Sequence, residues 1–193
     1  QFRSRAGPVV MGGIHASLVQ HEAARYVDAL CIGECEAGWP EVVADVERGQ
    51  LKPLYQGGTE GESLLVPDRK IFGKYQYEYV SAQTSRGCPM DCSFCSVTVF
   101  NGRLFRMRGI DEVVQELADV EARDIIFVDD DLNGFSRKAK QRAMELFRAM
   151  AAARLDKRWI TQVTINFGDD DEILELARQA GCAAAGRAAM RSA

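Results

Sequence analysis

The chain carries at residues 85–95 the sequence SRGCPMDCSFC, which spaces three cysteines as C-x3-C-x2-C. The remaining cysteines and both histidines lie more than fifty residues away along the chain. Iron–sulfur cubanes are usually held by four thiolates, so three thiolates would bind three irons and leave the fourth open to a small molecule. The spacing therefore predicts a cluster site formed by Cys88, Cys92 and Cys95.

Other uses of this loop fit its residues less well. A structural zinc site needs four ligands, and no fourth cysteine or histidine is close in sequence. A disulfide would require an oxidising compartment and would leave one thiol of the three over. Redox chemistry of the C-x-x-C kind at Cys92 and Cys95 would leave Cys88 without a role.

The loop, with Phe94 directly before its third cysteine, resembles the radical S-adenosylmethionine (SAM) superfamily. The resemblance implies a [4Fe-4S] cluster whose open iron binds the amino and carboxylate groups of SAM. It also implies reductive cleavage of SAM to a 5′-deoxyadenosyl radical, with an external electron donor such as flavodoxin or ferredoxin. Phe94 is therefore a cofactor-binding candidate, and no side chain is assigned a catalytic role.

Length and composition indicate an α/β protein with one or two domains. The chain has 193 residues, of which 47% are hydrophobic, enough for a packed core. Its net charge is −4 with scattered lysine and arginine, so no nucleic-acid partner is expected. No apolar run reaches the roughly 20 residues of a membrane helix, and no signal peptide is recognised. The clustered cysteines favour a reducing, cytoplasmic location.

The pattern of the first fifty residues predicts a doubly wound parallel sheet, because the expected strands and helices alternate along the chain. Residues 9–11 and 29–32 are expected to be short buried strands. A helix is expected from about Gly38, and its apolar face would consist of Val42, Val43 and Val46.

The sequence GGIHAS at residues 12–17, followed by IGECE at 32–36, resembles the C-terminal half of a cobalamin-binding domain. In the B12-binding branch of radical SAM proteins that domain precedes the cluster domain. The resemblance implies that Gly12, Gly13 and Ser17 bind cobalamin. A glycine-rich turn can also hold phosphate or ribose, or simply turn the chain.

Three side chains near these turns are expected to have ordinary roles. His15 is interpreted as a solvated or backbone-bonded histidine rather than a cobalt ligand. Cys35 stands where the family usually has glycine, and both Cys31 and Cys35 are expected to pack as small hydrophobic side chains.

From residue 79 onward strands and helices alternate regularly, which predicts a parallel barrel with right-handed crossovers. Strands are expected at residues 79–84, 125–128 and 159–166, with helices N-capped by Asp111 and Ser136 and a third helix from Asp169. Residues 183–189 show neither strand alternation nor a helical stripe. The resemblance adds that radical SAM cores are partial (β/α)6 barrels, of which the chain would hold three units and at most the start of a fourth.

Ligands of parallel α/β folds collect at the carboxyl ends of the strands. Asp129, Asp130 and Asp131 follow the second of these strands, where the resemblance places a motif that contacts the SAM amino group. Asp130 is the preferred candidate, and solvated acids or a divalent-ion site are the alternatives.

Two further groups of polar residues are candidates. In the third strand, either the even-numbered or the odd-numbered residues face the cavity, and the polar even-numbered set is preferred. This makes Gln162 and Thr164 cofactor-binding candidates. At least two of the three arginines that follow the cluster loop are expected to be solvated. These arginines are Arg103, Arg106 and Arg108.

These patterns, together with what the resemblance implies, predict an α/β chain in three parts. Residues 1–50 would be the C-terminal half of a doubly wound cobalamin-binding-like domain, residues 51–78 a linker, and residues 79–193 an incomplete (β/α)6 radical SAM partial barrel. Because the chain starts close to a buried strand and ends in an alanine-rich stretch, it is expected to be a fragment of a longer protein.

The expected function is that of a radical SAM enzyme acting on an unactivated carbon of a small-molecule substrate. Its cofactors would be the [4Fe-4S] cluster, SAM and, in the full-length protein, cobalamin, with methylation, cyclisation or rearrangement as the outcome. An iron–sulfur electron-transfer protein without SAM chemistry and a zinc-binding structural module remain alternatives.

Overall fold

The computed structural model describes residues 7–58, 64–70 and 77–187. Contacts divide the chain into two compact units. Unit 1 comprises the residues up to Glu62 together with Ser96–Gly102, and unit 2 comprises Ser63–Cys95 and the residues from Arg103 onward. No helix among the described residues is both long and apolar enough to cross a membrane.

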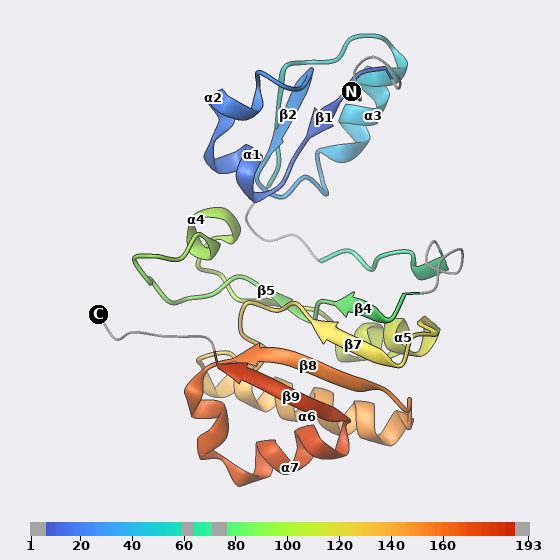
Figure 1. The fold of residues 1–193 in the computed structure, drawn as a ribbon, viewed down its shortest axis with the longest axis vertical. Helices are drawn as coiled ribbons and strands as arrows, with labels where there is room; N and C mark the ends of the chain where they lie inside the picture. The colour runs from blue at the N-terminus through green and yellow to red at the C-terminus, as the bar shows by residue number, and fades with distance from the viewer. Residues whose placement is uncertain (1–6, 59–63, 71–76, 188–193) are drawn as a thin grey trace. The chain divides into compact units, whose positions relative to one another are not determined.

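Unit 1 is a three-stranded parallel sheet with helices on both faces (Figure 1). Leu30 of the central strand packs with Ala16 and Ala23 on one face, whereas Cys31 packs with Val42 on the other. This is the doubly wound arrangement that the sequence predicts. The elements of unit 1 are β1 (Val10–Met11), α1 (Ile14–Leu18), α2 (Gln20–Ala23), β2 (Ala29–Ile32), α3 (Trp39–Glu47), β3 (Leu54–Gln56) and α4 (Val97–Asn101).

Strand β3 lies within residues 51–78, and the prediction that this segment is only a linker is wrong for β3. The strand pairs in parallel with β2. Tyr55 is its one buried residue, and the Tyr55 hydroxyl donates to Asp45 Oδ2 at 2.9 Å. A strand of three residues with a single buried side chain has no repeating pattern, so an analysis of periodicity cannot detect it.

Helix α3 begins where the sequence predicts but buries a different face. Val42 and Asp45 are buried, whereas Val43 and Val46 are exposed, contrary to the prediction. Asp45 can lie inside because its carboxylate accepts hydrogen bonds from the Tyr55 hydroxyl and from a nearby arginine of the same helix end.

Cys31 and Cys35 form a disulfide in this structure, a pairing that the sequence analysis did not predict. Their Cα atoms lie 6.0 Å apart, because the chain turns at Gly33, whose φ is +76°. Both side chains belong to the apolar cluster around Val42 and Tyr55, which is the packing expected of small hydrophobic residues.

Unit 2 is a four-stranded parallel sheet in the order β4-β7-β8-β9, with three helices packed into one shared core (Figure 1). Trp159 of β8 stacks on Phe147 of α6 with ring centroids 5.2 Å apart and meets Phe127 of β7 edge-on at 5.4 Å. The alternation of strands and helices agrees with the prediction. The elements are β4 (Tyr79–Ala82), β5 (Ser85–Arg86), β6 (Arg106–Met107), α5 (Ile110–Asp119), β7 (Asp124–Phe127), α6 (Arg137–Ala153), β8 (Arg158–Val163), the 3-10 helix η2 (Ile165–Asp169), α7 (Asp171–Gln179) and β9 (Cys182–Arg187).

The helix starts of unit 2 agree only in part with the prediction. Ser136 is the N-cap of α6, and its hydroxyl accepts from the Ala139 N–H at 3.0 Å. Gly109, not Asp111, is the N-cap of α5, and Asp111 lies in the first turn. Asp170 caps α7.

The last two strands differ from the prediction. Strand β8 ends at Val163, because the chain turns into η2 there, so the predicted extension to residue 166 is wrong. Strand β9 pairs in parallel with β8, although residues 183–189 show no strand alternation in the sequence. Alanine and glycine have too little contrast in hydropathy for β9 to show the alternation that marks a strand.

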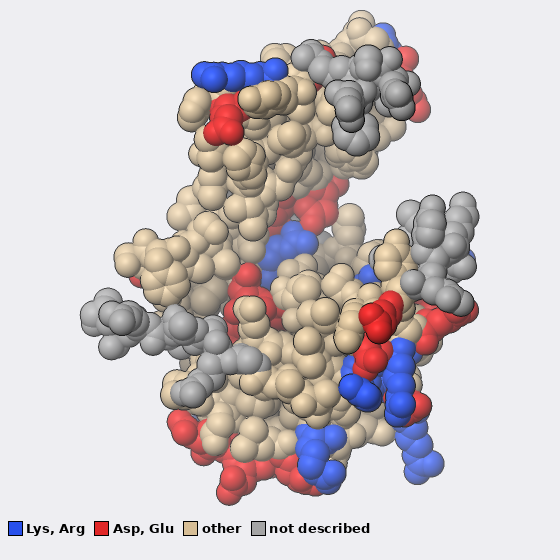
Figure 2. Space-filling view, viewed as in Figure 1, with Lys and Arg blue, Asp and Glu red and all other residues tan. Residues whose placement is uncertain are grey.

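Charges of both signs are mixed on the face of the described residues drawn in Figure 2. Basic side chains lie beside acidic ones there, rather than forming a continuous patch of their own. Such a mixed surface carries little long-range field of one sign.

Gly181, between α7 and β9, provides a test of this packing. Its φ is +95°, and a Cβ atom at this position would lie 2.0 Å from the Lys157 carbonyl oxygen. We expect Gly181→Ala to lower the free energy of unfolding by about 2 to 4 kcal/mol, because backbone strain adds to the clash. Chemical denaturation measures this change. Gly168→Ala is the matched control, since a Cβ atom there meets nothing within 4 Å. Equal effects of the two substitutions would contradict the packing of this turn.

Candidate functional site

The cysteine loop leaves β5 and carries three free, half-buried thiols, those of Cys88, Cys92 and Cys95. The Cys95 N–H donates to the Cys92 carbonyl oxygen at 3.0 Å, which closes the C-x2-C segment into a turn. Burial raises the pKa of the Cys88 thiol, and the carboxylates of Asp131 and Asp130 raise it further. Metal binding at Cys88 would therefore have to displace a firmly held proton.

The structure puts the three thiols on one loop without gathering them into a ready-made metal site. Among the described residues, no group of three or more His, Cys, Asp or Glu side chains is arranged to hold a metal ion. The donors nevertheless suit an iron–sulfur cluster, because all three are free thiols on one short loop.

The three aspartates that follow β7 have different partners. Asp129 is buried and accepts hydrogen bonds from Thr84 and Ser85, which lie just after β4. Asp130 Oδ2 accepts from the Gly87 N–H at 2.9 Å, so its carboxylate lies beside the start of the cysteine loop. Asp131 Oδ1 accepts from the Thr164 N–H at 3.3 Å, at the end of β8. The aspartates therefore connect the carboxyl ends of neighbouring strands.

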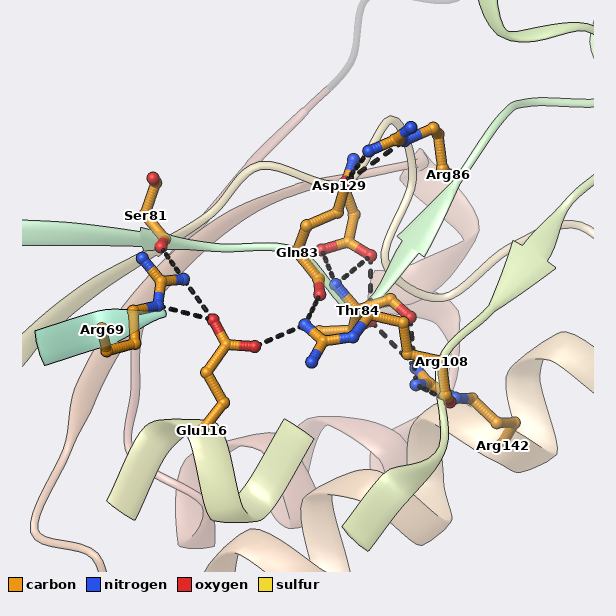
Figure 3. A network of polar contacts seen from close by, with 9 residues as sticks. All are labelled: Arg69, Ser81, Gln83, Thr84, Arg86, Arg108, Glu116, Asp129 and Arg142. Carbon is orange, nitrogen blue, oxygen red and sulfur yellow. Dashed lines mark hydrogen bonds and ion pairs between the residues drawn. The ribbon is translucent and has the colours of Figure 1, made fainter. Parts of the chain in front are cut away.

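A network of buried charges surrounds the end of β4 (Figure 3). Arg142 of α6 donates to Thr84 Oγ1 at 2.9 Å, to the Thr84 carbonyl at 3.2 Å and to the Arg108 carbonyl at 2.9 Å. Arg108 donates to the Gln83 carbonyl at 2.8 Å and to Glu116 at 2.5 Å. Glu116 of α5 also accepts from Arg69.

Burial shifts the proton affinities in this network. It raises the pKa of Asp129, and the hydrogen bonds from Ser85 and Thr84 act in the opposite direction. It lowers the pKa of the Arg142 guanidinium, and the Asp129 carboxylate opposes that shift. The protonation of Asp129 and of Arg142 therefore depends on the polar and charged groups around each of them.

Two of the three arginines after the cysteine loop are buried, so the prediction that at least two are solvated is wrong. The exposed fractions of Arg106 and Arg108 are 9% and 6%. Arg103 does lie at the surface, where it forms an ion pair of 2.5 Å with Asp91 of the cysteine loop. Arg108 can be buried because the Glu116 carboxylate and the Gln83 carbonyl accept its hydrogen bonds.

The other predicted residues of unit 2 lie in different surroundings. Trp159 and Val163 of β8 belong to the core shared with the helices, so alternation puts Gln162 on the opposite face, where it is exposed. Thr164 is buried and bonded to Asp131, Asn133 and Asn166. Phe94 is 68% exposed on the cysteine loop.

In unit 1, the predicted cobalamin residues connect two turns at the carboxyl edge of the sheet. The Ser17 hydroxyl donates to the Gly13 carbonyl at 2.9 Å and accepts from the Gly33 N–H at 2.9 Å. Gly12 lies so close to Cys35 that a Cβ atom at Gly12 would approach its sulfur to 3.2 Å. His15 is exposed on α1, in keeping with an ordinary polar role.

Residues 83–186 match the family model for the radical SAM superfamily. This chain belongs to the radical SAM superfamily. It is 30% identical to bacteriochlorophyllide d C-12(1)-methyltransferase of Chlorobaculum tepidum, covering 90% of this chain and 40% of the relative. It is 29% identical to hopanoid C-3 methylase of Methylococcus capsulatus, covering 77% of this chain and 33% of the relative. The chain therefore spans less than half the length of these relatives.

Solved structures of cobalamin-dependent members share the fold. The radical SAM methyltransferase TsrM from Kitasatospora setae, with tryptophan substrate and a SAM analogue, aligns with a TM-score of 0.68 at 20% identity, covering 93% of this chain and 41% of TsrM. The cobalamin-dependent SAM radical enzyme OxsB aligns with a TM-score of 0.69 at 15% identity, covering 92% of this chain and 30% of OxsB. The parallel α/β architecture is thus that of radical SAM structures.

Sequence reasoning missed the charged network of this superfamily member. Glu116 and Arg142 occupy positions within the apolar stripes of α5 and α6, next to the buried Leu117 and Ala143. A charged residue at such a position is the detectable feature, because a lone buried charge is costly and therefore indicates a partner. No comparable sequence feature marks Thr84 as a member of this network.

Asp131 gives a pH-dependent prediction for the metal-free chain. Burial raises its pKa from 3.8 to about 6. Between pH 3.8 and about 6 the folded chain therefore keeps the Asp131 proton, whereas the unfolded chain has released it. The resulting contribution to the free energy of unfolding is fully present below pH 3.8 and is lost as the pH rises through about 6. We expect Asp131→Asn to be about 1 to 3 kcal/mol more stable than the unaltered chain at pH 7.5.

Chemical denaturation at several pH values measures this difference, which should shrink toward pH 4. Asp119→Asn, at the exposed end of α5, is the matched control for replacing an aspartate by asparagine. A difference between Asp131→Asn and the unaltered chain that stays constant from pH 4 to 7.5 would contradict the burial of an ionisable Asp131.

Proposed function

We propose that the protein is a cobalamin-dependent radical SAM methyltransferase. The observation that carries this proposal is the set of three free thiols on one loop at the carboxyl edge of a parallel sheet, inside the segment that matches the family. The methyltransferases among its relatives support methylation over cyclisation or rearrangement.

Cys88, Cys92 and Cys95 would hold a [4Fe-4S] cluster. When bound, that cluster would supply the electron that cleaves SAM reductively to a 5′-deoxyadenosyl radical. The chain itself places the loop: Asp130 accepts from Gly87, next to Cys88, so the cluster would lie close to the carboxyl end of β7.

Four residues of unit 2 are proposed to contact SAM. Asp130 offers a carboxylate beside the cysteine loop that could accept a hydrogen bond from the SAM ammonium group. Thr164 and Gln162 lie at the end of β8, on the edge of the sheet where ligands of parallel folds bind. Phe94 offers an exposed aromatic face within the loop.

In unit 1, Gly12, Gly13 and Ser17 are proposed to contact cobalamin. The turns after β1 and β2 meet through the Ser17 hydroxyl, which brings two glycine-containing turns to one edge of the sheet. Glycines allow a large planar ligand to approach the backbone closely. The proposed division keeps residues 1–50 and 79–193 for these two cofactor regions, and the linker of residues 51–78 contains β3, which belongs to the sheet of unit 1.

The remaining features of the proposal concern partners and location. The substrate would be a small molecule with an unactivated carbon, and the electron would come from a donor such as flavodoxin or ferredoxin. An oxygen-sensitive cluster requires a reducing compartment such as the cytoplasm, and there Cys31 and Cys35 would be thiols rather than a disulfide.

Iron loading tests the cluster site. Anaerobic reconstitution should load about four irons and four sulfides per chain, the content of one cubane. Replacing Cys88, Cys92 or Cys95 by Ala should abolish loading in each case, because three thiolates are the minimum for this site. Cys182→Ala is the control and should load normally. Iron and sulfide analysis measures the content, and stoichiometric zinc without iron would contradict the proposal.

SAM binding tests Asp130. SAM added to the reduced cluster should change its electron paramagnetic resonance spectrum, and Asp130→Asn should weaken SAM binding roughly tenfold, since the amide keeps an acceptor for Gly87 but loses the charge. Asp111→Asn, exposed in the first turn of α5, is the matched control. A spectrum that does not change when SAM is added would favour an electron-transfer protein without SAM chemistry. Equal effects of the two substitutions on SAM binding would contradict a contact between Asp130 and SAM.

A further inference from the structure

Asp129 holds the point where the cysteine loop departs from the sheet. Its Oδ1 atom accepts from Thr84 Oγ1 at 2.9 Å, from Ser85 Oγ at 2.5 Å and from the Thr84 N–H at 3.1 Å, and its Oδ2 atom lies 3.1 Å from the same N–H. The carboxylate is 3% exposed. Its oxygens are therefore bonded within the fold rather than available to a ligand.

Thr84 connects this carboxylate to helix α6. Its hydroxyl donates to Asp129 and accepts from Arg142 Nη1 at 2.9 Å, so one buried hydroxyl joins a carboxylate and a guanidinium. A threonine hydroxyl has one proton to donate and lone pairs to accept with, so both bonds can form at once. Thr84 is 0% exposed, and water cannot replace either partner.

The short path from Thr84 to Cys88 passes through a constrained backbone. Ser85–Arg86 pairs with Arg106–Met107 as β5 and β6, and Gly87 has a φ of +90°. The Gly87 N–H is held by Asp130. Every residue between Thr84 and Cys88 is thus fixed by a strand pair, a turn or a carboxylate.

We propose that Asp129 is a positioning residue for the cysteine loop, acting through Thr84, with Arg142 holding Thr84 from the side of α6. This rests on the proposed function in that Cys88 is taken to bind the cluster. The neighbouring residues Asp129 and Asp130, which follow β7, would therefore have different roles. Asp129 fixes the loop from within the core, and Asp130 lies at the surface of the site.

The distinguishing prediction is local. With Asp129→Asn, the amide exchange of Thr84 in the metal-free chain should accelerate tenfold or more, because a charge-assisted hydrogen bond is about twice as strong as a neutral one. Iron release from the reconstituted cluster to a ferrous chelator should accelerate by about tenfold, the scale typical of outer-shell partners of metal ligands.

A rescue pair at Thr84 tests whether the hydroxyl carries the effect. Thr84→Val removes the hydroxyl at nearly constant shape and should reproduce Asp129→Asn, whereas Thr84→Ser keeps the hydroxyl and should behave like the unaltered chain. The double variant Asp129→Asn with Thr84→Val should be no worse than the more affected single variant, because both substitutions act on the same hydrogen bond, which Asp129→Asn weakens and Thr84→Val removes. Additive effects would overturn the proposal.

Asp124→Asn is the matched control for general destabilisation. Asp124 begins β7, at the opposite end of the strand from Asp129, and pairs with Arg158 at 3.2 Å. It should leave Thr84 exchange and iron release unchanged. If Asp129→Asn changes neither quantity, or Asp124→Asn changes both as strongly, the positioning role is refuted.

The metal-free measurement separates this proposal from the proposed function. If the unaltered chain fails to load iron, the cluster site is contradicted, while Thr84 exchange still decides whether Asp129 holds the loop. If the unaltered chain loads iron and Asp129→Asn releases it at the same rate, the cluster site stands and the positioning role of Asp129 is refuted.

Discussion

The hydrogen bonds from Thr84 and Ser85 to the Asp129 carboxylate are the interaction on which the site of unit 2 depends. They join the carboxyl ends of β4 and β7, whose residues are about 45 positions apart in sequence. Backbone groups at a strand end have lost their partners in the sheet and need others when buried. Asp129 supplies those partners at the point where the cysteine loop leaves the sheet.

A carboxylate in this place requires compensation from the helices around it. Desolvation penalises both the Asp129 charge and the Arg142 charge, and the Thr84 hydroxyl forms a hydrogen bond with each of the two groups. Glu116 plays the corresponding part between Arg69 and Arg108, where all three side chains are at most 9% exposed. Replacing such a network by apolar side chains is often neutral or stabilising, whereas removing a single partner is costly because it leaves a buried charge uncompensated.

Periodicity predicted the parts of the fold that repeat, including the strand at residues 29–32 and the helix capped by Ser136. It failed for β3, which buries only Tyr55, and for β9, whose alanines show no alternation. The cysteine spacing predicted the family, because ligand number and spacing are local in sequence. The partners of Asp129 could not be predicted in the same way, since they come together only when separate strand ends and α6 meet in three dimensions.

Both units fix their strand-end turns with a hydroxyl side chain. In unit 1 the Ser17 hydroxyl joins the turn at Gly13 to the turn at Gly33, and in unit 2 the Thr84 hydroxyl joins Asp129 to Arg142. A hydroxyl is suited to this task because it donates and accepts in a small volume and needs no charge of its own. Turns held in this way can present backbone and carboxylate groups to a cofactor without first having to become ordered, which lowers the entropy lost on binding.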